Sequence, residues 1–355
     1  MKRWCAWPAR LVLALGLLAL LLGFYLAWPT HPPSVPPRQR VPVLSHVFLV
    51  VMENHAPNTL TGANTPYIHH LMQADGYDAA YYGVTHVSLP NYLALLAGRT
   101  FGTHSDNPDQ TFSGPTLAEE LNRRHISWEA VMQSLPYRGY SGNWYPEPRG
   151  QNPTVMPINA LYAKKHDPFM LFTSVRQHDA SHVVPLRILV RELHTGQVPR
   201  FVWITPNLCD DMHGQPPGSR SCPSNRPALA ARDGDRFLRW LVPQITHSSA
   251  FRGHSVLFIT WDEANMPSSL WNLAAWKRWL SWGPLAPRIL GIPVGGGPVP
   301  LIAIIPGRRQ PPHVHLWADH YNLLKTIEAG FRLPYLGHTR SPAVTLLTPL
   351  LTPRR

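Results

Sequence analysis

Three apolar, strand-like runs of this 355-residue chain each end in carboxylate or amide side chains. A carboxylate directly after a buried strand is costly unless it is paired, binds a metal or faces a water-filled crevice. In open α/β sheets, ligands bind at the carboxyl ends of the strands, so we expect the three ends to share one site. The runs and their endings are His46–Met52 with Glu53-Asn54, Phe201–Thr205 with the string Pro206 to His213, and Ser255–Thr260 with Trp261-Asp262-Glu263.

These endings offer oxygen ligands for a metal ion. Glu53, Asp262 and Glu263 contribute carboxylates and Asn54 contributes an amide oxygen. Oxygen ligands suit hard cations such as Mg²⁺, Mn²⁺ or Ca²⁺, and carboxylates also bind Zn²⁺. Each residue alone is better explained as a solvated loop residue or a helix cap. Their shared position after strands favours a divalent metal site.

Ser88 is the candidate nucleophile. It stands just before a predicted helix, where backbone N–H groups and the helix dipole stabilise an alkoxide and bind phosphate. Taken alone, Ser88 is better explained as an ordinary N-cap. A carboxylate-bound metal changes that balance, because it lowers the pKa of a coordinated hydroxyl and neutralises phosphate charge.

Two histidines are singled out by their acidic neighbours. His213 and His320 stand beside Asp211 and Asp319, and either could be a metal ligand, a phosphate clamp or a general acid. The chain has 19 histidines, so any single one is more often incidental.

The elements that must position these residues alternate between apolar runs and helix-like segments, which predicts a largely parallel α/β sheet flanked by helices. A further buried strand is expected at Leu301–Ile305. Tyr137–Pro157 and Met266–Gly297 look irregular and could be lids or substrate-facing insertions. The expected helices are Pro90–Ala97 stopped by Gly98, Thr116–His125 with a capping box from Thr116 to Glu119, Asp233–Val242 with Phe237, Leu238, Trp240 and Leu241 on one side, and a helix from an Asp319 cap through Ala329 that ends at Gly330.

Composition narrows the class of protein. Hydrophobic residues make up 44% and charged residues 15%, which supports a globular core. The net charge is 32 − 20 = +12, but the positive charges are scattered and form no nucleic-acid motif, so we expect no nucleic-acid partner. A basic surface would attract phosphorylated or anionic-lipid substrates.

The N-terminal region predicts export. Residues 11–28 carry no charge and follow Lys2, Arg3 and Arg10, so residues 1–28 are either a cleaved signal peptide or a membrane anchor. Residues 29–42 form a Pro-rich linker, residues 43–346 the working domain and residues 347–355 a C-terminal tail. The domain would lie outside the cytoplasm, anchored to the membrane through the N-terminal segment or secreted.

Cysteine usage agrees with an oxidising compartment. Cys5 precedes the apolar segment, and Cys209 and Cys222 are left in the outer domain. We expect these two to form a disulfide that closes the loop after the second strand, although two free thiols would also fit the sequence.

Five short motifs occur in one order along the chain. Together they resemble the phosphoesterase family of bacterial acid phosphatases and phosphatidylcholine-type phospholipases C, within the alkaline phosphatase superfamily. The resemblance covers residues 43–346. The motifs are Glu53-Asn54-His55, Ser88-Leu89-Pro90-Asn91, Pro206-Asn207-x-x-x-Asp211-x-His213, Trp261-Asp262-Glu263 and His320 to Glu328.

The resemblance implies an alkaline-phosphatase-like fold and a covalent mechanism. Ser88 would attack phosphorus, and water would then release phosphate from phospho-Ser88. The implied catalytic residues are Ser88, His213 and His320, the metal ligands Glu53, Asn54, Ser88, Asp262 and Glu263, and the substrate-binding residues Asn91, Asn207 and Asp211.

The chain departs from the family pattern in two places. Ala56-Pro57-Asn58 replaces a Ser-Tyr/Phe-Asp run, and Gly214 stands where relatives often have Asp. The first change alters a supporting shell, and the second removes a candidate ligand or hydrogen-bond partner.

The leading hypothesis is a metal-dependent phosphomonoesterase, because the domain is short for a phospholipase C and has no obvious C-terminal lipid-binding domain. Phosphodiesterase or phospholipase C activity on phospholipids is the alternative. A non-catalytic surface protein that keeps the fold and binds a ligand or cell-wall polymer is the competing class.

Overall fold

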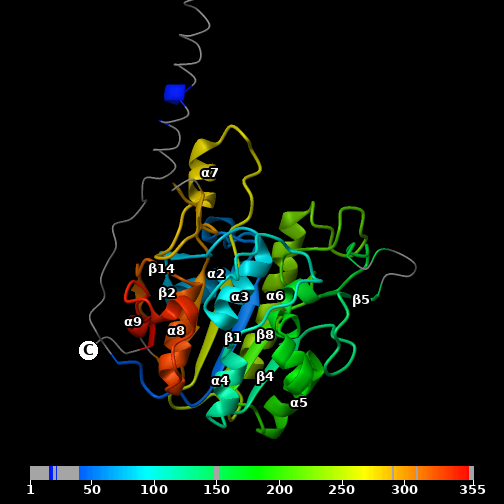
Figure 1. Ribbon diagram of the computed structural model, residues 1–355, viewed down its shortest axis with the longest axis vertical. Coiled ribbons are helices and arrows are strands. Elements are labelled where there is room, and N and C mark those ends of the chain that lie inside the picture. The colour runs from blue at the N-terminus through cyan, green and yellow to red at the C-terminus, as the bar shows by residue number, and fades with distance from the viewer. Residues whose placement is uncertain are drawn as a thin grey trace, which may run out of the picture.

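A computed structural model describes residues 16–18, 21, 40–147, 152, 154–289, 292–308 and 311–351 (Figure 1). Its centre is an eight-stranded sheet in the order β13-β2-β12-β9-β1-β8-β4-β7. The strands are β1 Val47–Met52, β2 Gly76–Asp78, β4 Trp128–Met132, β7 Val183–Pro185, β8 Phe201–Thr205, β9 Val256–Trp261, β12 Leu301–Ile304 and β13 His313–Val314.

The sheet is largely parallel, which confirms the predicted fold class. β9, β1, β8, β4 and β7 run parallel, β12 pairs antiparallel with β9 and with β2, and β13 is parallel to β2. Every residue of β1, β8 and β9 is buried, as expected for parallel strands covered on both faces.

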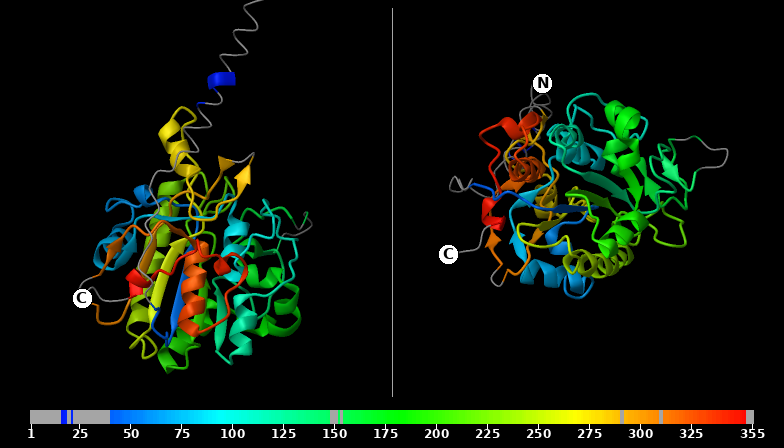
Figure 2. Two further views of the ribbon diagram at one scale, coloured as in Figure 1. Left: turned by 60° about the vertical axis from the view of Figure 1, so that its left-hand side comes forward. Right: turned by 90° about the horizontal axis from the view of Figure 1, so that it is seen from below.

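Helices cover both faces of the sheet. α3 packs against α8 on one face, and α2 packs against α6 on the other. The right-hand view of Figure 2 shows orange α8 and yellow-green α6 on opposite sides of the strands. The helices are α2 Pro66–Ala74, α3 Ser88–Ala97, α4 Leu117–Arg123, α5 Leu186–Thr195, α6 Pro227–Thr246, α7 Leu273–Trp279, α8 His320–Phe331 and α9 Thr348–Leu351.

Three of the predicted helix starts and stops are confirmed. α3 ends at Gly98 in the left-handed conformation, and the Thr116 side chain accepts a hydrogen bond from the Glu119 N–H at the start of α4. Asp319 caps α8, and a capping box with Asn322 supports it.

Other details of the helix predictions are wrong. α6 runs from Pro227 to Thr246 and is longer at both ends than the predicted Asp233–Val242. Gly330 does not end α8, which continues to Phe331 with Arg332 as the left-handed cap. Glycine is used there because a Cβ would lie 2.3 Å from Leu44 Cδ1. Trp240 lies at the edge of the apolar stripe of α6 and is 46% exposed, so it is not part of the buried face.

The segments expected to be irregular contain short regular pieces. The second of them carries α7 and the β10-β11 ribbon, and the first contains β5. The two-stranded ribbons are β5 Trp144–Tyr145 with β6 Tyr162–Ala163, β3 Tyr81–Tyr82 with β14 Ala318–Asp319, and β10 Arg288–Ile289 with β11 Ile292–Pro293. The single-turn helices are η1 Pro57–Thr59, η2 Lys164–His166, η3 Pro168–Leu171, η4 Val175–Asp179, η5 Ala180–His182 and η6 Gly337–Arg340.

The two ends of the chain differ in what is described. The predicted apolar segment 11–28 and the linker 29–42 lie almost wholly outside the described residues. Among the residues that are described, none belongs to a helix with the length and hydropathy needed to span a bilayer. At the other end, α9 follows Leu347, and Leu347, Leu350 and Leu351 pack into the core.

Candidate active site

The carboxyl ends of β9, β1 and β8 meet at one edge of the sheet, as the sequence predicts. Met52 pairs with Trp261, so the residues that follow them lie side by side. The Glu53 N–H donates to the Asp211 carbonyl at 2.8 Å, and the Asn54 N–H donates to Asp262 Oδ1 at 3.0 Å. The three strand ends therefore form one cluster.

Ser88, the first residue of α3, is buried in this cluster. Its hydroxyl oxygen lies 3.1 Å from Glu53 Oε2 and 3.2 Å from Glu263 Oε1, and it can donate to either carboxylate. A serine held between two acidic groups at a helix start has both a proton acceptor and a favourable dipole.

Asn91 has a structural role instead of the expected substrate contact. Its Oδ1 accepts from the N–H groups of Val84 and Thr85, and its Nδ2 donates to the carbonyls of Thr85 and Val87. All four bonds hold the loop that leads into Ser88, so the amide is fully used within the protein.

Several oxygen atoms of the cluster are buried without a hydrogen-bond partner among the described residues: Glu53 Oε1, Asn54 Oδ1 and Asp262 Oδ2. Burial, and then the negative charge of Asp262, raise the pKa of Glu53 well above its usual range. Burial and the neighbouring Glu263 do the same to the pKa of Asp262. Such oxygens are stable together only with protons or a cation between them.

His166 of η2 joins the cluster, and the sequence did not single it out. Its Nδ1 lies 3.2 Å from Asp211 Oδ2, and its Nε2 lies 3.1 Å from Glu53 Oε1 without a hydrogen bond to it. Burial and the nearby Lys165 charge lower the pKa of His166 well below its ordinary value. A neutral ring that donates to Asp211 leaves the bare Nε2 facing a carboxylate oxygen, as in carboxylate–histidine–metal arrangements.

His213 is placed beside His166. Its Nδ1 lies 2.7 Å from the Gly214 carbonyl, which makes Nε2 the acceptor in the neutral ring. Burial and Lys165 lower the pKa of His213 to about 4. These features suit a ligand better than a general acid at neutral pH.

Lys165 is a buried cation at the edge of the cluster. Its Nζ donates to Asp106 Oδ2 at 2.8 Å and lies 3.4 Å from His213 Nε2. Burial lowers the pKa of Lys165, but the charges of Asp106 and Glu53 outweigh burial and raise it above its ordinary value. Asp106 also accepts from the Leu89 N–H at 3.0 Å, which ties Lys165 to the start of α3.

The donor set fits a divalent metal ion. Ligand atoms of Glu53, His166 and His213 lie within 4.8 Å of one another. Two ligand atoms on one ion at about 2.0–2.1 Å lie roughly 3 Å apart, close to the separation of Glu53 Oε1 and His166 Nε2. The unpartnered oxygens of Asn54 and Asp262 extend the set, and the Ser88 hydroxyl contacts Glu53 and Glu263.

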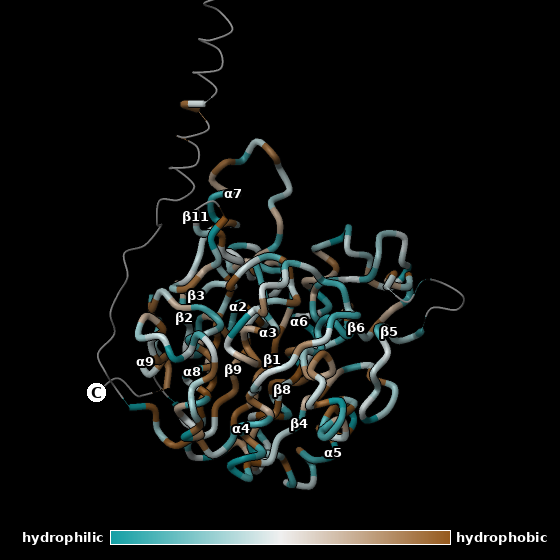
Figure 3. Tube along the Cα trace, in the orientation of Figure 1, coloured by the Kyte–Doolittle hydropathy of each residue, from teal (hydrophilic) through white to brown (hydrophobic). Residues whose placement is uncertain are grey.

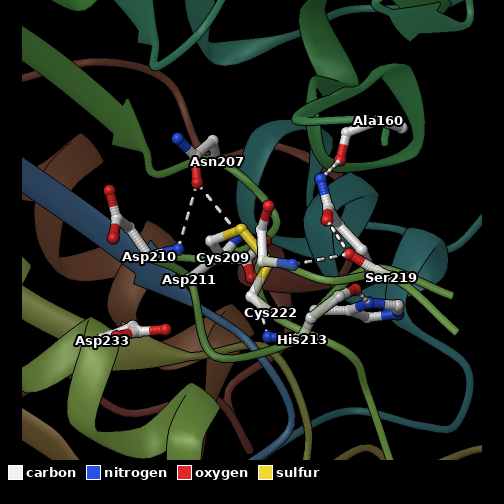
Figure 4. Close-up of a disulfide and its surroundings, with 12 residues drawn as sticks. Ala160, Asn207, Cys209, Asp210, Asp211, His213, Ser219, Cys222 and Asp233 are labelled. Carbon is white, nitrogen blue, oxygen red and sulfur yellow. Dashed lines mark hydrogen bonds between the residues drawn. A yellow bond between two sulfur atoms is a disulfide. The ribbon is translucent and has the colours of Figure 1, made fainter. Parts of the chain in front are cut away.

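The loop that carries Asp211 and His213 is tied by the predicted disulfide. Cys209 and Cys222 are bonded, with their Cα atoms 5.4 Å apart (Figure 4). Gly214 has φ 82°, and a Cβ there would lie 2.8 Å from Ser224 Cα, so the close return of the loop explains why this position holds no aspartate.

Asn207 stabilises this loop from within, whereas we expected it to bind substrate. Its Oδ1 accepts from the N–H groups of Cys209 and Asp210, and its Nδ2 donates to Ser134 Oγ (Figure 4 shows the first two bonds). Asp211 lies in the cluster, but its oxygens contact His166 and the His213 N–H. Among the described residues, one hydrogen of Asn207 Nδ2 is left over, and the other hydrogen bonds of both side chains are made within the protein.

His320 lies behind the cluster and not in it. Its Nε2 is 2.6 Å from the Asp262 carbonyl, its Nδ1 is 2.9 Å from the Tyr81 hydroxyl, and the residue is buried. Burial lowers its pKa to about 4. The structure thus makes His320 a support for the backbone of Asp262, where we expected a catalytic histidine.

His86 supports the opposite side. Its Nδ1 contacts Glu263 Oε2, its Nε2 is 2.8 Å from the Trp279 carbonyl, and its ring stacks on Trp279 at 3.8 Å between centroids. His86 therefore fixes the Glu263 carboxylate that faces Ser88.

A cleft of about 950 Å³ opens onto the cluster. Asn54, His213 and Glu263 of the cluster line it, together with the polar residues His55, Thr59, Asn64, His86, Ser224, Asn265 and Ser268. Its remaining wall is largely apolar and includes Val87, Met212, Pro227, Ala228, Ala231, Met266 and Trp279.

The residues that sequence reasoning missed come mainly from one charged run. Lys164, Lys165, His166 and Asp167 stand between apolar segments, and all four are buried. The feature of the sequence that could have indicated these residues is a charged run placed between two apolar segments, Leu161–Ala163 and Phe169–Phe172.

Comparison with known proteins identifies the family of the chain. The Phosphoesterase family model matches residues 58–334. A phosphate-repressible acid phosphatase of Penicillium chrysogenum is 28% identical over 263 residues, which are 72% of this chain and 52% of that protein. A phosphatidylinositol-3-phosphatase of Mycobacterium tuberculosis is 26% identical over 346 residues, 95% of this chain and 94% of that protein. The chain spans about half the length of the Penicillium protein and of an Aspergillus fumigatus acid phosphatase.

Solved structures share the fold at low identity. A Vibrio parahaemolyticus protein of the alkaline phosphatase superfamily matches with a TM-score of 0.51 at 12% identity, covering 95% of this chain and 78% of that one. A phosphonate monoester hydrolase of Agrobacterium radiobacter gives 0.52 at 14% identity, covering 86% and 77%. These matches show that the chain shares the fold of those two proteins.

Proposed function

The chain belongs to the phosphoesterase family, and we propose that it hydrolyses phosphate monoesters through a phosphorylated Ser88, with a divalent metal ion in the cluster. One observation carries the proposal. The Ser88 hydroxyl lies between Glu53 and Glu263, amid buried donor atoms that have no partner of their own.

Glu53, Asn54, Asp262, His166 and His213 are the residues that would hold the metal. When bound, a divalent cation neutralises phosphate charge and lowers the pKa of a hydroxyl in contact with it. The mixed oxygen and imidazole set suits Zn²⁺ or Mn²⁺, and the oxygen donors alone also suit Mg²⁺ or Ca²⁺.

Ser88 supplies the nucleophile. Its hydrogen passes to Glu263 or Glu53 as Oγ bonds to phosphorus and the bond from phosphorus to the alcohol oxygen breaks. The leaving alkoxide takes a proton from a water in the cleft. The hydroxide that remains then attacks phosphorus of phospho-Ser88, the bond from Oγ to phosphorus breaks, and phosphate leaves while Ser88 Oγ takes back the proton held by the glutamate. The start of α3 stabilises negative charge at both steps.

The test is Ser88→Ala in the full chain. We expect turnover of p-nitrophenyl phosphate to fall by about a thousandfold or more, because no other nucleophile lies between the two carboxylates. Ser255→Ala is the matched control, since Ser255 is also buried but lies at the start of β9, away from the cluster. Full activity in the Ser88 variant would refute the role.

Substrate preference is read from a second assay. The same protein is given p-nitrophenyl phosphate and its phosphocholine diester. Hydrolysis of the monoester with little hydrolysis of the diester supports a phosphomonoesterase. Cleavage of the diester alone makes the protein a phosphodiesterase or phospholipase C and overturns the monoesterase proposal.

A further inference from the structure

Residues 266–289, here named the projecting segment, stand out from the body of the protein beyond the carboxyl ends of the strands (Figure 1). Among the described residues, 14 large hydrophobic side chains are exposed, and five of them lie in this segment. Figure 3 shows the apolar residues along its outer loop. They are Met266 (65% exposed), Leu270 (77%), Trp271 (93%), Leu273 (53%) and Ile289 (59%). Such a concentration on one projection marks a binding surface.

The charge of the segment is one-sided. The sequence has no acidic residue between Glu263 and Asp319. Within the projecting segment stand Lys277, Arg278 and Arg288, and the last two are exposed. The surface therefore combines apolar side chains with positive charge and suits an anionic partner.

We infer that the projecting segment docks on a bilayer that contains anionic phospholipid. Tryptophan and leucine side chains insert at the level of the headgroups, and the basic residues meet lipid phosphates. Met266 belongs both to this surface and to the wall of the cleft, so docking brings the cleft mouth to the lipid headgroups. The substrate class that follows, phosphate esters carried by lipids, rests on the proposed function, whereas the docking does not.

The shape of the surface favours a bilayer over a protein partner. A standard protein interface draws on roughly 20–30 residues from each side. The projecting segment offers five large apolar side chains on a protruding loop and short helix, and each can enter lipid without a complementary partner surface.

The segment is joined directly to the catalytic cluster. Trp279, at the end of α7, stacks on His86, and His86 contacts Glu263, which faces Ser88. At the outer end, the Trp276 indole N–H donates to the Ser269 carbonyl. The Trp276 ring packs on the Trp279 ring, with 5.3 Å between their centroids. The docking surface and the nucleophile are thus connected through packed side chains.

The test places an environment-sensitive fluorophore at Ser269→Cys in a Cys5→Ser background of the full chain. Ser269 is exposed next to Leu270, so the label leaves the apolar residues in place. Ser249→Cys is the matched control, because it is exposed just after α6, near the start of β9 at the opposite end of the strands. Vesicles carry a lipid-attached nitroxide quencher and are made of phosphatidylcholine alone or mixed with phosphatidylglycerol.

We expect quenching at position 269 to be at least about twofold stronger than at 249, and stronger on the vesicles that contain phosphatidylglycerol. Leu270→Ser with Trp271→Ser should weaken docking by about tenfold, because it removes two apolar anchors. Equal quenching at 269 and 249, or no loss in the double variant, overturns the inference. Shielding of the label that depends on protein concentration without vesicles also overturns it, in favour of a second copy of the chain.

Activity separates this inference from the proposed function. Neither Leu270 nor Trp271 lines the cleft, so the double variant should keep its turnover of p-nitrophenyl phosphate and lose about tenfold on a phosphatidic acid presented in anionic vesicles. The quenching needs no turnover, so an inactive protein that still docks refutes the phosphatase proposal and leaves the docking intact. Unchanged turnover of the vesicle substrate overturns the docking role.

Discussion

Glu53 and Glu328 are both fully buried glutamates, yet their surroundings differ. Glu328, inside α8, accepts the Leu336 N–H at 2.9 Å and lies 2.7 Å from the Thr339 hydroxyl, so both of its oxygens have partners. Glu53 accepts a hydrogen bond from Ser88 on one oxygen, and its other oxygen has no hydrogen-bond donor among the described residues. Asp262 likewise has one oxygen without a hydrogen-bond donor there.

Burial raises the pKa of both side chains, and for Glu328 it does so to about 8. Burial and a raised pKa therefore do not identify a functional carboxylate in this protein. The distinguishing feature of Glu53 is an oxygen without a hydrogen-bond partner in the described part of the chain that lies close to His166 Nε2, another atom of this kind, beside the Ser88 hydroxyl.

The largest expected effect comes from Glu53→Gln. Turnover of p-nitrophenyl phosphate should fall by about a thousandfold, because the cluster loses a negatively charged metal ligand that lies next to both Ser88 and His166. The metal-free variant should unfold at the same or a higher temperature than the metal-free wild type, since one of the mutually repelling carboxylates is gone. Kinetics and thermal unfolding measure the two effects. Glu328→Gln is the control and should keep its activity.

Metal removal should be next in size. Chelation should abolish activity and lower the unfolding free energy by about 3–4 kcal/mol, the stabilisation expected from an ion at 100- to 1,000-fold above its dissociation constant. Thermal unfolding with and without chelator measures the loss, and adding back Mg²⁺, Mn²⁺, Ca²⁺ or Zn²⁺ one at a time identifies the ion. The Glu328→Gln variant should lose as much as the wild type, and Glu53→Gln much less. An equal loss in both variants would contradict the assignment of donors.

Glu328→Ala should reverse the pattern. The Leu336 N–H loses its acceptor in a buried position, which costs about 2 kcal/mol of unfolding free energy. Turnover by the folded protein should stay unchanged, because Glu328 does not touch the cluster. Denaturant unfolding and kinetics on one preparation provide the check, and a loss of turnover without a loss of stability would break the comparison.

The change that is most gradual per pH unit is a pH dependence of stability. Burial raises the pKa of Glu328 from 4.5 to about 8, so its contribution is complete below the lower value and is lost as pH rises through the upper one. Between pH 4.5 and about 8, the unfolding free energy of the wild type relative to that of Glu328→Gln should fall by up to about 1.4 kcal/mol per pH unit. Unfolding of both proteins across this range measures it, and parallel curves would argue against the shift.

The sequence predicts the strand ends better than their neighbours. Glu53, Asp262 and Glu263 could be placed together because parallel strands bring their carboxyl ends to one edge. His166 and Lys165 could not, because a charged run after a short strand reads as a solvated loop, and only the packing of η2 under α3 buries it.

Residue type also fails to show where a side chain points. Asn91, Asn207 and His320 have the right chemistry for a phosphate site. In the structure, however, each forms hydrogen bonds to backbone groups of the protein. Hydrogen bonds within the protein compete with ligand binding for the same polar groups. The sequence does not show which of the two partners each group has, whereas the structure does.

The disulfide fits a protein that works outside the cytoplasm, and it sets an order of assembly. Asp211 and His213 lie between Cys209 and Cys222 along the chain, so the loop that carries them is fastened only after the thiols are oxidised. A newly made chain in a reducing compartment lacks this disulfide, and we expect the proposed metal site to be incomplete there. Under the proposed function, activity would begin only once the disulfide between Cys209 and Cys222 has formed.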